Sequence, residues 1–203
     1  MSATENGVRE DRVPWPLEIE APGVFDWTED DFEALIETGA ASRLGRIELR
    51  GGVIWRMNSI HVPHARMRGA VVNVLIDALK TSTIDLNVLQ EVTVRCPGYM
   101  PTPDIVTFVD RRQRKSVPIA DVRLIAEIAD TTLDDDLGDK RARYAAAGLA
   151  EYWVVDMPGR RILRFDAPGA AGFRAAPIVA AGERCESLTL AGVAIATADL
   201  PWD

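Results

Sequence analysis

One stretch of the sequence holds the residues best suited to chemistry, residues 122–156, which read VRLIAEIADTTLDDDLGDKRARYAAAGLAEYWVVD. Its first eight residues are mostly apolar and carry one carboxylate, Glu127. A run of this length and composition predicts a strand that is buried on both faces. A carboxylate inside such a strand is costly unless a cation neutralises it, and the nearest candidate downstream is Lys140. The buried acid, the acidic loop after it and the lysine together indicate a metal-dependent site.

Two other carboxylates could join Glu127. Asp104 opens a second predicted strand, residues 104–109, and Glu48 alternates with apolar neighbours on a third. If the strands of Asp104 and Glu127 are neighbours, the two side chains can meet at one end of the sheet. Carboxylate oxygens are the ligands that Mg²⁺ prefers, and a metal held in this way can activate water and neutralise charge on a phosphate. A nearby lysine would orient that water or stabilise the developing charge.

Each of these residues also has a plain structural interpretation. Asp104 follows a proline and could be a turn or cap residue. Glu48 could lie on a solvated strand face, and Lys140 could pair with Asp136 four residues earlier on a helix. Glu127 is harder to explain in this way, because its neighbours are apolar. The interpretations of the other three stay open on the residues alone.

Other residues could suggest different chemistry. His61 and His64 resemble a metal-binding pair, but Pro63 between them breaks the helical geometry that a zinc pair needs, so zinc is disfavoured. Three aromatic residues are better explained as core than as base-stacking groups: Tyr144, Tyr152 and Trp153. The basic segment DRRQRK, residues 110–115, is typical of a solvated loop, yet we expect it to lie beside the proposed cleft, where it could meet phosphates.

The elements that must position these residues alternate between helix and strand. Thr28 is a predicted N-cap for a helix that ends near Gly39, and Pro63 suits the first turn of a longer helix that runs to about Lys80. Gly148 can close a short helix, residues 139–147, in a left-handed cap. The predicted strands are residues 46–57 as a hairpin around a Gly-Gly turn, 86–95, 104–109, 122–129, 152–155, 161–166, 188–190 and 193–196. This order predicts an α/β (α+β) fold with a mixed central β-sheet flanked by helices.

Composition narrows the class of protein. With 203 residues, 47% hydrophobic and 27% charged, the chain is typical of one globular domain, expected over residues 23–203 after a flexible leader, residues 1–22. The N-terminus lacks the apolar core of a signal peptide, no apolar run could span a membrane, and two cysteines indicate a reducing compartment, so we expect a cytoplasmic protein. The net charge of −8 disfavours non-specific coating of nucleic acid but leaves a local basic groove open.

The order of these motifs resembles a known family. Pro103-Asp104, Glu127, Lys140 and Tyr144 are followed by Gly148 and by Glu151-Tyr152-Trp153. This pattern is similar to the Uma-two family of restriction endonuclease-like proteins, within the PD-(D/E)XK nuclease superfamily. The similarity covers roughly residues 27–200 and is densest in PDIVTFVD, LIAEIAD and DLGDKRARYAAAGLAEYWVVD.

The resemblance implies a restriction endonuclease-like PD-(D/E)XK fold with an N-terminal helix and hairpin, and it implies roles for six residues. Glu48, Asp104 and Glu127 would be ligands of Mg²⁺ or Mn²⁺, and Lys140 would be the catalytic lysine. His64 and Tyr144 would be accessory residues. The sequence departs from the superfamily pattern at Ala129, where the lysine of E-X-K would stand, and this leaves the lysine function to Lys140.

The implied activity is Mg²⁺-dependent hydrolysis of phosphodiester bonds in DNA. A symmetric homodimer would cut both strands most simply, and apolar residues such as Trp153 and Phe165 could supply part of its interface. The alternative is a module of the same fold whose site has decayed and which acts in nucleic-acid binding or protein assembly. For an active site, we expect the first turn after residue 138 to fold back so that the Lys140 ammonium faces Asp104 and Glu127, with Tyr144 beside the lysine stem.

Overall fold

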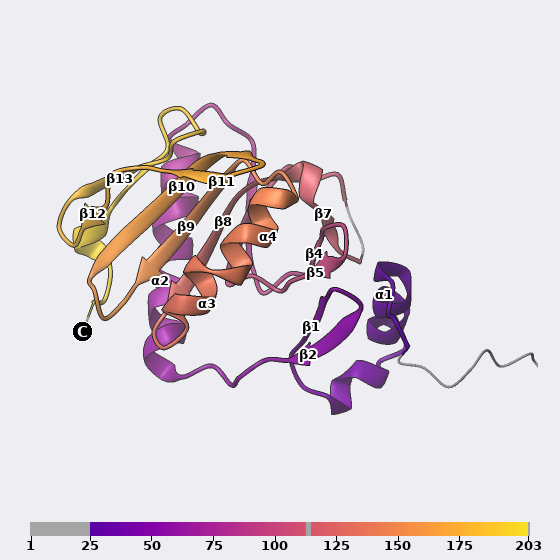
Figure 1. Cartoon of the computed structure of the whole chain (residues 1–203). Helices are drawn as coiled ribbons and strands as arrows, with labels where there is room; N and C mark the ends of the chain where they lie inside the picture. The colour runs from indigo at the N-terminus through magenta and orange to yellow at the C-terminus, as the bar shows by residue number, and fades with distance from the viewer. Residues whose placement is uncertain (1–24, 113–114, 203) are drawn as a thin grey trace, which may run out of the picture.

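A mixed β-sheet forms the centre of the computed structural model, which describes residues 25–112 and 115–202 (Figure 1). Within these residues the sheet has seven strands, six of them in the order β11-β10-β9-β8-β6-β3, with β12 paired to β10. Their bounds are β3 Asn87–Gln90, β6 Ile105–Phe108, β8 Val122–Ala129, β9 Glu151–Asp156, β10 Arg161–Gly169, β11 Gly172–Ala175 and β12 Val179–Ala180. The predicted leader, residues 1–22, lies outside the described residues.

Strand β8 lies in the middle of this sheet. It pairs antiparallel with β6 and parallel with β9. The parallel neighbours are joined by a crossover that carries α3 (Leu133–Leu137) and α4 (Asp139–Ala146), as parallel strands require. The α4 helix ends before Gly148, whose φ of 79° allows the left-handed cap that the sequence predicts.

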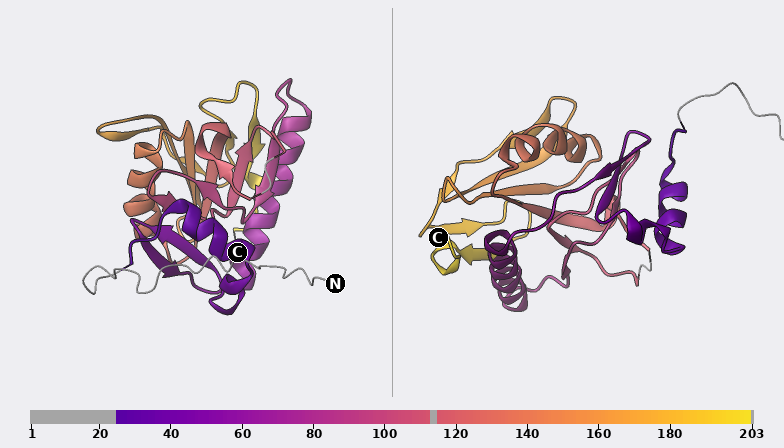
Figure 2. Two further views of the ribbon diagram at one scale, coloured as in Figure 1. Left: turned by 90° about the vertical axis from the view of Figure 1, so that its right-hand side faces the viewer. Right: turned by 90° about the horizontal axis from the view of Figure 1, so that it is seen from below.

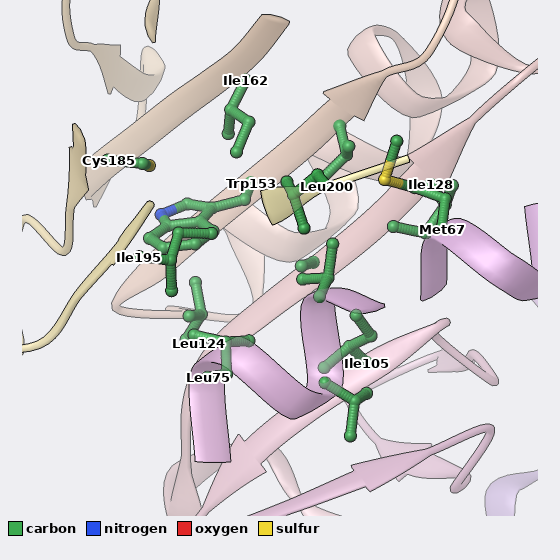
Figure 3. Packing of buried hydrophobic residues seen from close by; sticks show 14 of the residues in the cluster. Met67, Leu75, Ile105, Leu124, Ile128, Trp153, Ile162, Cys185, Ile195 and Leu200 are labelled. Atoms are coloured by element: carbon green, nitrogen blue, oxygen red, sulfur yellow. The ribbon is translucent and has the colours of Figure 1, made fainter. Parts of the chain in front are cut away.

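Both faces of the sheet are covered. Helix α2 (Val62–Lys80) lies on one face together with the C-terminal hairpin of β13 (Arg184–Glu186) and β14 (Ala194–Ala196). Figure 3 shows Trp153 in this core, near Leu75, Leu124, Ile162 and Ile195. The other face packs against α3 and α4, with the aromatic residues Tyr144, Tyr152 and Phe165 in its core. The central strands are therefore buried on both faces, as their composition predicts.

The N-terminal part lies beside the main sheet (Figures 1 and 2). It contains α1 (Glu29–Glu37), the short 3-10 helix η1 (Ala40–Arg43), β1 (Ile47–Arg50) and β2 (Val53–Arg56). The predicted cap of α1 is present, because Thr28 and Asp31 form a reciprocal capping box. The hairpin pairs with β5 (Tyr99–Met100) in a three-stranded sheet over a small core of Phe32, Ala41, Ile47, Leu49 and Met100.

Some predicted elements were wrong in detail. Residues 86–95 are not one strand: β3 ends at Gln90, Glu91 turns the chain with a φ of 51°, and β4 (Val94–Arg95) pairs instead with β7 (Val117–Pro118). The predicted loop after β8 holds the one-turn helix α3. Residues 188–190 form no strand, because the backbone N–H groups of Leu188 and Thr189 donate to the Glu151 carboxylate instead of to a β-ladder.

Two further points concern the surface. Trp153 and Phe165 are buried in the core, so they cannot supply the dimer interface that their apolar character suggested. Among the helices of the described ranges, none combines the length and the hydropathy that crossing a lipid bilayer requires.

Candidate active site

Asp104 and Glu127 come from adjacent antiparallel strands. The register pairs Ile105 with Ala126, which sets Asp104 opposite Glu127. The backbone N–H of Asp104 donates to Glu127 Oε2 at 3.3 Å, and the N–H of Ile128 donates to Asp104 Oδ2 at 2.9 Å. Both side chains are buried. The two strands are therefore neighbours, as the sequence argument required, and the two carboxylates lie together at one end of the sheet.

Lys140 reaches the same place from α4. Its Nζ lies 2.7 Å from Asp136 Oδ1 and 3.4 Å from Glu127 Oε2, and its side chain is buried. Gly138 separates α3 from α4 with φ −100° and ψ −103° and ends the first helix, so Lys140 stands in the first turn of a new one. The two interpretations of Lys140 are therefore both present in the fold: it pairs with Asp136, and it also faces Glu127.

Asp136 is a member of this cluster whose burial the sequence did not indicate. It is 1% exposed, and Thr132 Oγ1 donates to its Oδ2 at 2.6 Å. The hydroxyl of Tyr152 donates to its backbone oxygen at 3.0 Å, which fixes the turn that carries it. The acidic run of residues 134–136 was the available signal, but nothing in the run tells which of its carboxylates points inward.

Negative charge is costly to place in this cluster. Burial raises the pKa of Glu127 to about 8; the Lys140 charge opposes this shift, and the charges of Asp104 and Asp136 add to it. Burial also acts to raise the pKa of Asp104, but the hydrogen bond and charge of His64 and the Ile128 N–H outweigh it and hold that pKa below its usual value. The buried carboxylates of Asp104, Glu127 and Asp136 thus surround a single buried lysine. The raised pKa of Glu127 means that a further negative charge is costly here, and a cation bound beside Glu127 would remove that cost.

Two accessory residues orient the carboxylates. The Tyr144 hydroxyl donates to Glu127 Oε1 at 2.9 Å from a fully buried ring. His64, in the first turn of α2, places its Nε2 3.2 Å from Asp104 Oδ2. Arg68, one turn later on α2, lies 3.7 Å from Asp104 Oδ1, and the sequence analysis did not single it out.

Glu48 occupies the β1 side of the site. Only 2% of its surface is exposed, so the interpretation as a solvated strand face is wrong. Its Oε2 accepts hydrogen bonds from Arg50 Nε at 3.2 Å and Nη2 at 3.0 Å, and its Oε1 accepts one from the Thr102 N–H at 2.9 Å. Arg50 also reaches Asp135 at 3.4 Å, so this arginine connects the hairpin to α3.

The candidate site opens into a pocket of about 300 Å³. Its wall includes Glu48, Asp104, Glu127 and Lys140, and also Arg46, Met57, Asn58, Ser59, Ile60, His61, His64, Thr102, Ile128, Asp130, Thr131 and Thr132. The basic segment, residues 110–115, is not part of this wall where the structure describes it. Lys115 pairs with Glu37 and Arg111 with Asp121, so the expectation that this segment adjoins the cleft is wrong for those residues; Gln113 and Arg114 lie outside the described residues.

Comparison with known proteins identifies the family. A family model, Uma2, with the description "Putative restriction endonuclease", matches residues 29–198. The chain belongs to the Uma2 family. This is the Uma-two family that the sequence motifs resemble. None of the curated proteins matches this Uma2 chain.

A solved structure supports the fold of this Uma2 protein. It is the crystal structure of "a putative nuclease belonging to DUF820" from Anabaena variabilis. The match has a TM-score of 0.59 and 12% sequence identity, and it covers 75% of this chain and 88% of that one. At this identity the likeness establishes the α+β fold with its mixed central sheet.

The donors of the Uma2 pocket fit a hard divalent cation better than zinc. Asp104 and Glu127 offer carboxylate oxygens, and Mg²⁺ is commonly bound by one or two carboxylates while it keeps several waters. Within residues 25–112 and 115–202 no group of three or more His, Cys, Asp or Glu side chains is arranged to hold a metal by itself. A zinc site would need such a group. His64 is turned to Asp104.

Proposed function

We propose that this Uma2 protein is a Mg²⁺- or Mn²⁺-dependent endonuclease that hydrolyses phosphodiester bonds of DNA. The observation that carries the proposal is the buried Asp104–Glu127 pair on the pocket wall, with the Lys140 ammonium 3.4 Å from Glu127. Paired buried carboxylates, whose negative charge is costly without a cation, suit a divalent ion, and a buried ammonium beside them suits a water that attacks phosphorus. Family membership supports the reaction class.

In this proposal the residues of the site have three roles: they hold the ion, orient the attacking water, and keep the carboxylates in place. Asp104 and Glu127 would hold the ion, and Glu48 would exchange its hydrogen bonds with Arg50 and Thr102 to join them as a third ligand. When bound, the ion would neutralise charge on the phosphate and lower the pKa of a water. Lys140 would orient the attacking water and stabilise charge on the phosphate oxygens. Tyr144 and His64 would keep the oxygens of Glu127 and Asp104 in place through the contacts described above.

We further propose a homodimer, because one site per chain must meet two strands of a duplex. Sedimentation at tens of micromolar measures the mass directly, and a monomer alone would contradict this part of the proposal.

A second function is favoured by one observation. Ala129, where the superfamily has its lysine, is 0% exposed and packed in the core, so the superfamily's usual arrangement is absent. A chain with a decayed site would act as a nucleic-acid-binding or assembly module. Such a chain would bind Mn²⁺ no better than its Glu127→Ala variant, whereas the nuclease should bind it much more tightly.

A cleavage assay tests the main proposal. Wild type with Mg²⁺ or Mn²⁺ should nick or cut DNA, and Asp104→Asn or Glu127→Gln should abolish this. Asp85→Asn is the matched control, because it removes an exposed carboxylate from a loop outside the pocket wall. All variants should follow one purification, which removes contaminating nucleases equally. Equal cleavage by wild type and the two site variants would overturn the proposal.

A further inference from the structure

Trp55 is a large aromatic residue that stays exposed next to the pocket. Its exposed fraction is 53%, whereas the rings of Tyr144, Tyr152 and Trp153 are buried. The β1–β2 register pairs Trp55 directly with Glu48, which lines the pocket. Residues opposite each other in an antiparallel pair share a face, with Cβ atoms about 4.5–5.5 Å apart. The indole therefore leaves the hairpin on the same face as Glu48.

The next residue on this face of the chain also belongs to the pocket. Side chains alternate along a strand, so Met57 follows Trp55 on the same side. The Met57 N–H donates to the Arg46 oxygen at 2.8 Å, which continues the hairpin ladder beyond β2. Met57 and Arg46 both line the pocket. Trp55 is outside the pocket wall, with pocket residues beside it across the ladder and along the chain.

Arg50 supports the ring from one side. Its guanidinium carbon lies 5.7 Å from the centroid of the Trp55 ring, and Glu48 and Asp135 fix the guanidinium by ion pairs of 3.0 and 3.4 Å. A cation at this distance is attracted to the ring face. The indole therefore has a supported position, while about half of its surface faces solvent.

We propose that Trp55 is a stacking platform for an unpaired nucleobase that neighbours the scissile phosphodiester. This inference rests on the proposed function and names its substrate class, DNA that contains unpaired nucleotides. In a duplex both faces of a base are covered by its neighbours, so the indole can stack only on a base that is single-stranded or frayed. Stacking needs no positive charge, and this suits a chain of net charge −8.

Fluorescence titration tests the platform without relying on cleavage. The full-length protein is titrated with a short single-stranded oligothymidylate in Ca²⁺ buffer, and separately with a hairpin duplex of equal length. Stacking on indole should quench the tryptophan emission with the single strand and much less with the duplex. Trp55→Phe should remove most of this quench while changing Kd only a few-fold, because a phenyl ring can still stack.

Trp55→Ala should weaken binding of the single strand by roughly 5- to 150-fold, which corresponds to the usual 1–3 kcal/mol per stacked base. Val53→Ala is the matched control, because Val53 lies on the same face of β2, is half exposed and faces Arg50 across the ladder, away from the pocket end. Thermal melts should show both variants folded, since neither side chain is in the core.

Wild-type affinity in Trp55→Ala would overturn the inference, as would equal quenching by the duplex or no binding of the single strand by wild type. None of these results bears on cleavage of paired DNA, which the metal-dependent assay measures separately. Conversely, a quench that depends on Trp55 in a protein that cuts nothing would sustain the platform and overturn the nuclease.

Discussion

Asp104 and Glu127 are fixed relative to each other through the backbone. The N–H of Asp104 donates to a Glu127 oxygen, and the N–H of Ile128, the residue after Glu127, donates to an Asp104 oxygen. Each carboxylate thus accepts a hydrogen bond from the strand of the other. Their separation is set by the β6–β8 ladder and not by flexible side chains, which is the preorganisation that a metal site requires.

Divalent metal should stabilise the folded protein through this pair. A ligand that binds only the native state adds about 2.7 kcal/mol to the free energy of unfolding at one hundred times its Kd. We expect Mn²⁺ to raise the Tm of wild type and of the control Asp85→Asn, and not that of Asp104→Asn. Differential scanning fluorimetry across a Mn²⁺ series measures this. The same rise in all three proteins would place the ion elsewhere.

Removal of Lys140 should cost stability as well as activity. Lys140→Met leaves Asp136 and Glu127 buried without their cation, and loss of one partner of a buried pair typically costs about 3–5 kcal/mol. Urea unfolding should show a loss of this size, and cleavage should vanish at temperatures where the variant is folded. Arg141→Met, one residue further on and exposed, is the control and should lose less than about 1 kcal/mol. Equal losses in the two variants would mean that the Lys140 pairs contribute nothing specific.

A lysine placed at residue 129 should not replace Lys140. Ala129 lies in the core cluster that also contains Tyr144 and Tyr152, and none of its surface is exposed. A long ammonium side chain there would be overpacked and desolvated. Lys140→Met combined with Ala129→Lys should therefore be less stable than Lys140→Met alone and equally inactive. Recovery of cleavage in the double variant would show that the core around Ala129 can open toward the pocket.

The Tyr144 hydroxyl should matter for Glu127 more than for the core. Tyr144→Phe leaves Glu127 Oε1 without its 2.9 Å hydrogen bond, and a buried acceptor left unpaired costs about 1–3 kcal/mol. Tyr152→Phe is the matched comparison, because its hydroxyl bonds a backbone oxygen of Asp136 in the same aromatic cluster. We expect similar losses in urea unfolding and a larger loss of kcat in Tyr144→Phe. The reverse order of activities would remove Tyr144 from the site.

The two cysteines should be inert in the native protein. Burial raises the pKa of Cys96 and of Cys185 to about 12, because a thiolate in either place would be desolvated. At pH 8 iodoacetamide should therefore label neither thiol until urea unfolds the chain, which mass spectrometry can follow. The unfolded thiols ionise first, so this contribution to stability is present below about pH 9 and is lost as the pH rises toward 12. Rapid labelling of native protein at pH 8 would contradict the burial of these side chains.

The sequence by itself determined the elements whose cause is local. The apolar run of residues 122–129 is β8, Thr28 caps α1, and Gly148 closes the turn after α4. Each of these features depends on residues that are close together in the sequence: the run of apolar side chains, the capping residue and the glycine that allows a left-handed φ. The sequence also indicated that Glu127 in β8 has a functional or charged partner, because a buried carboxylate among apolar residues requires one. The sequence thus located one end of the site and the lysine that faces it.

Only the tertiary structure decided which residues share that site. Asp136 is buried while Asp135 is only partly buried, although both stand in one acidic run, because α3 turns Asp136 toward Lys140 and Asp135 toward Arg50. Residues 188–190 do not form the predicted strand, because the N–H groups of Leu188 and Thr189 donate to the buried carboxylate of Glu151 on β9.

The sequence pattern of Glu48 is that of an exposed strand residue, but in the fold its carboxylate is buried and accepts hydrogen bonds from Arg50 and from the Thr102 N–H. Burial of a charged side chain depends on partners that are distant in the chain, and spacing along the sequence does not encode where those partners arrive. The strands of Asp104 and Glu127 were predictable as strands. That they are neighbours in the right register, with Trp55 opposite Glu48 on the hairpin, follows from how the sheet and the hairpin pack.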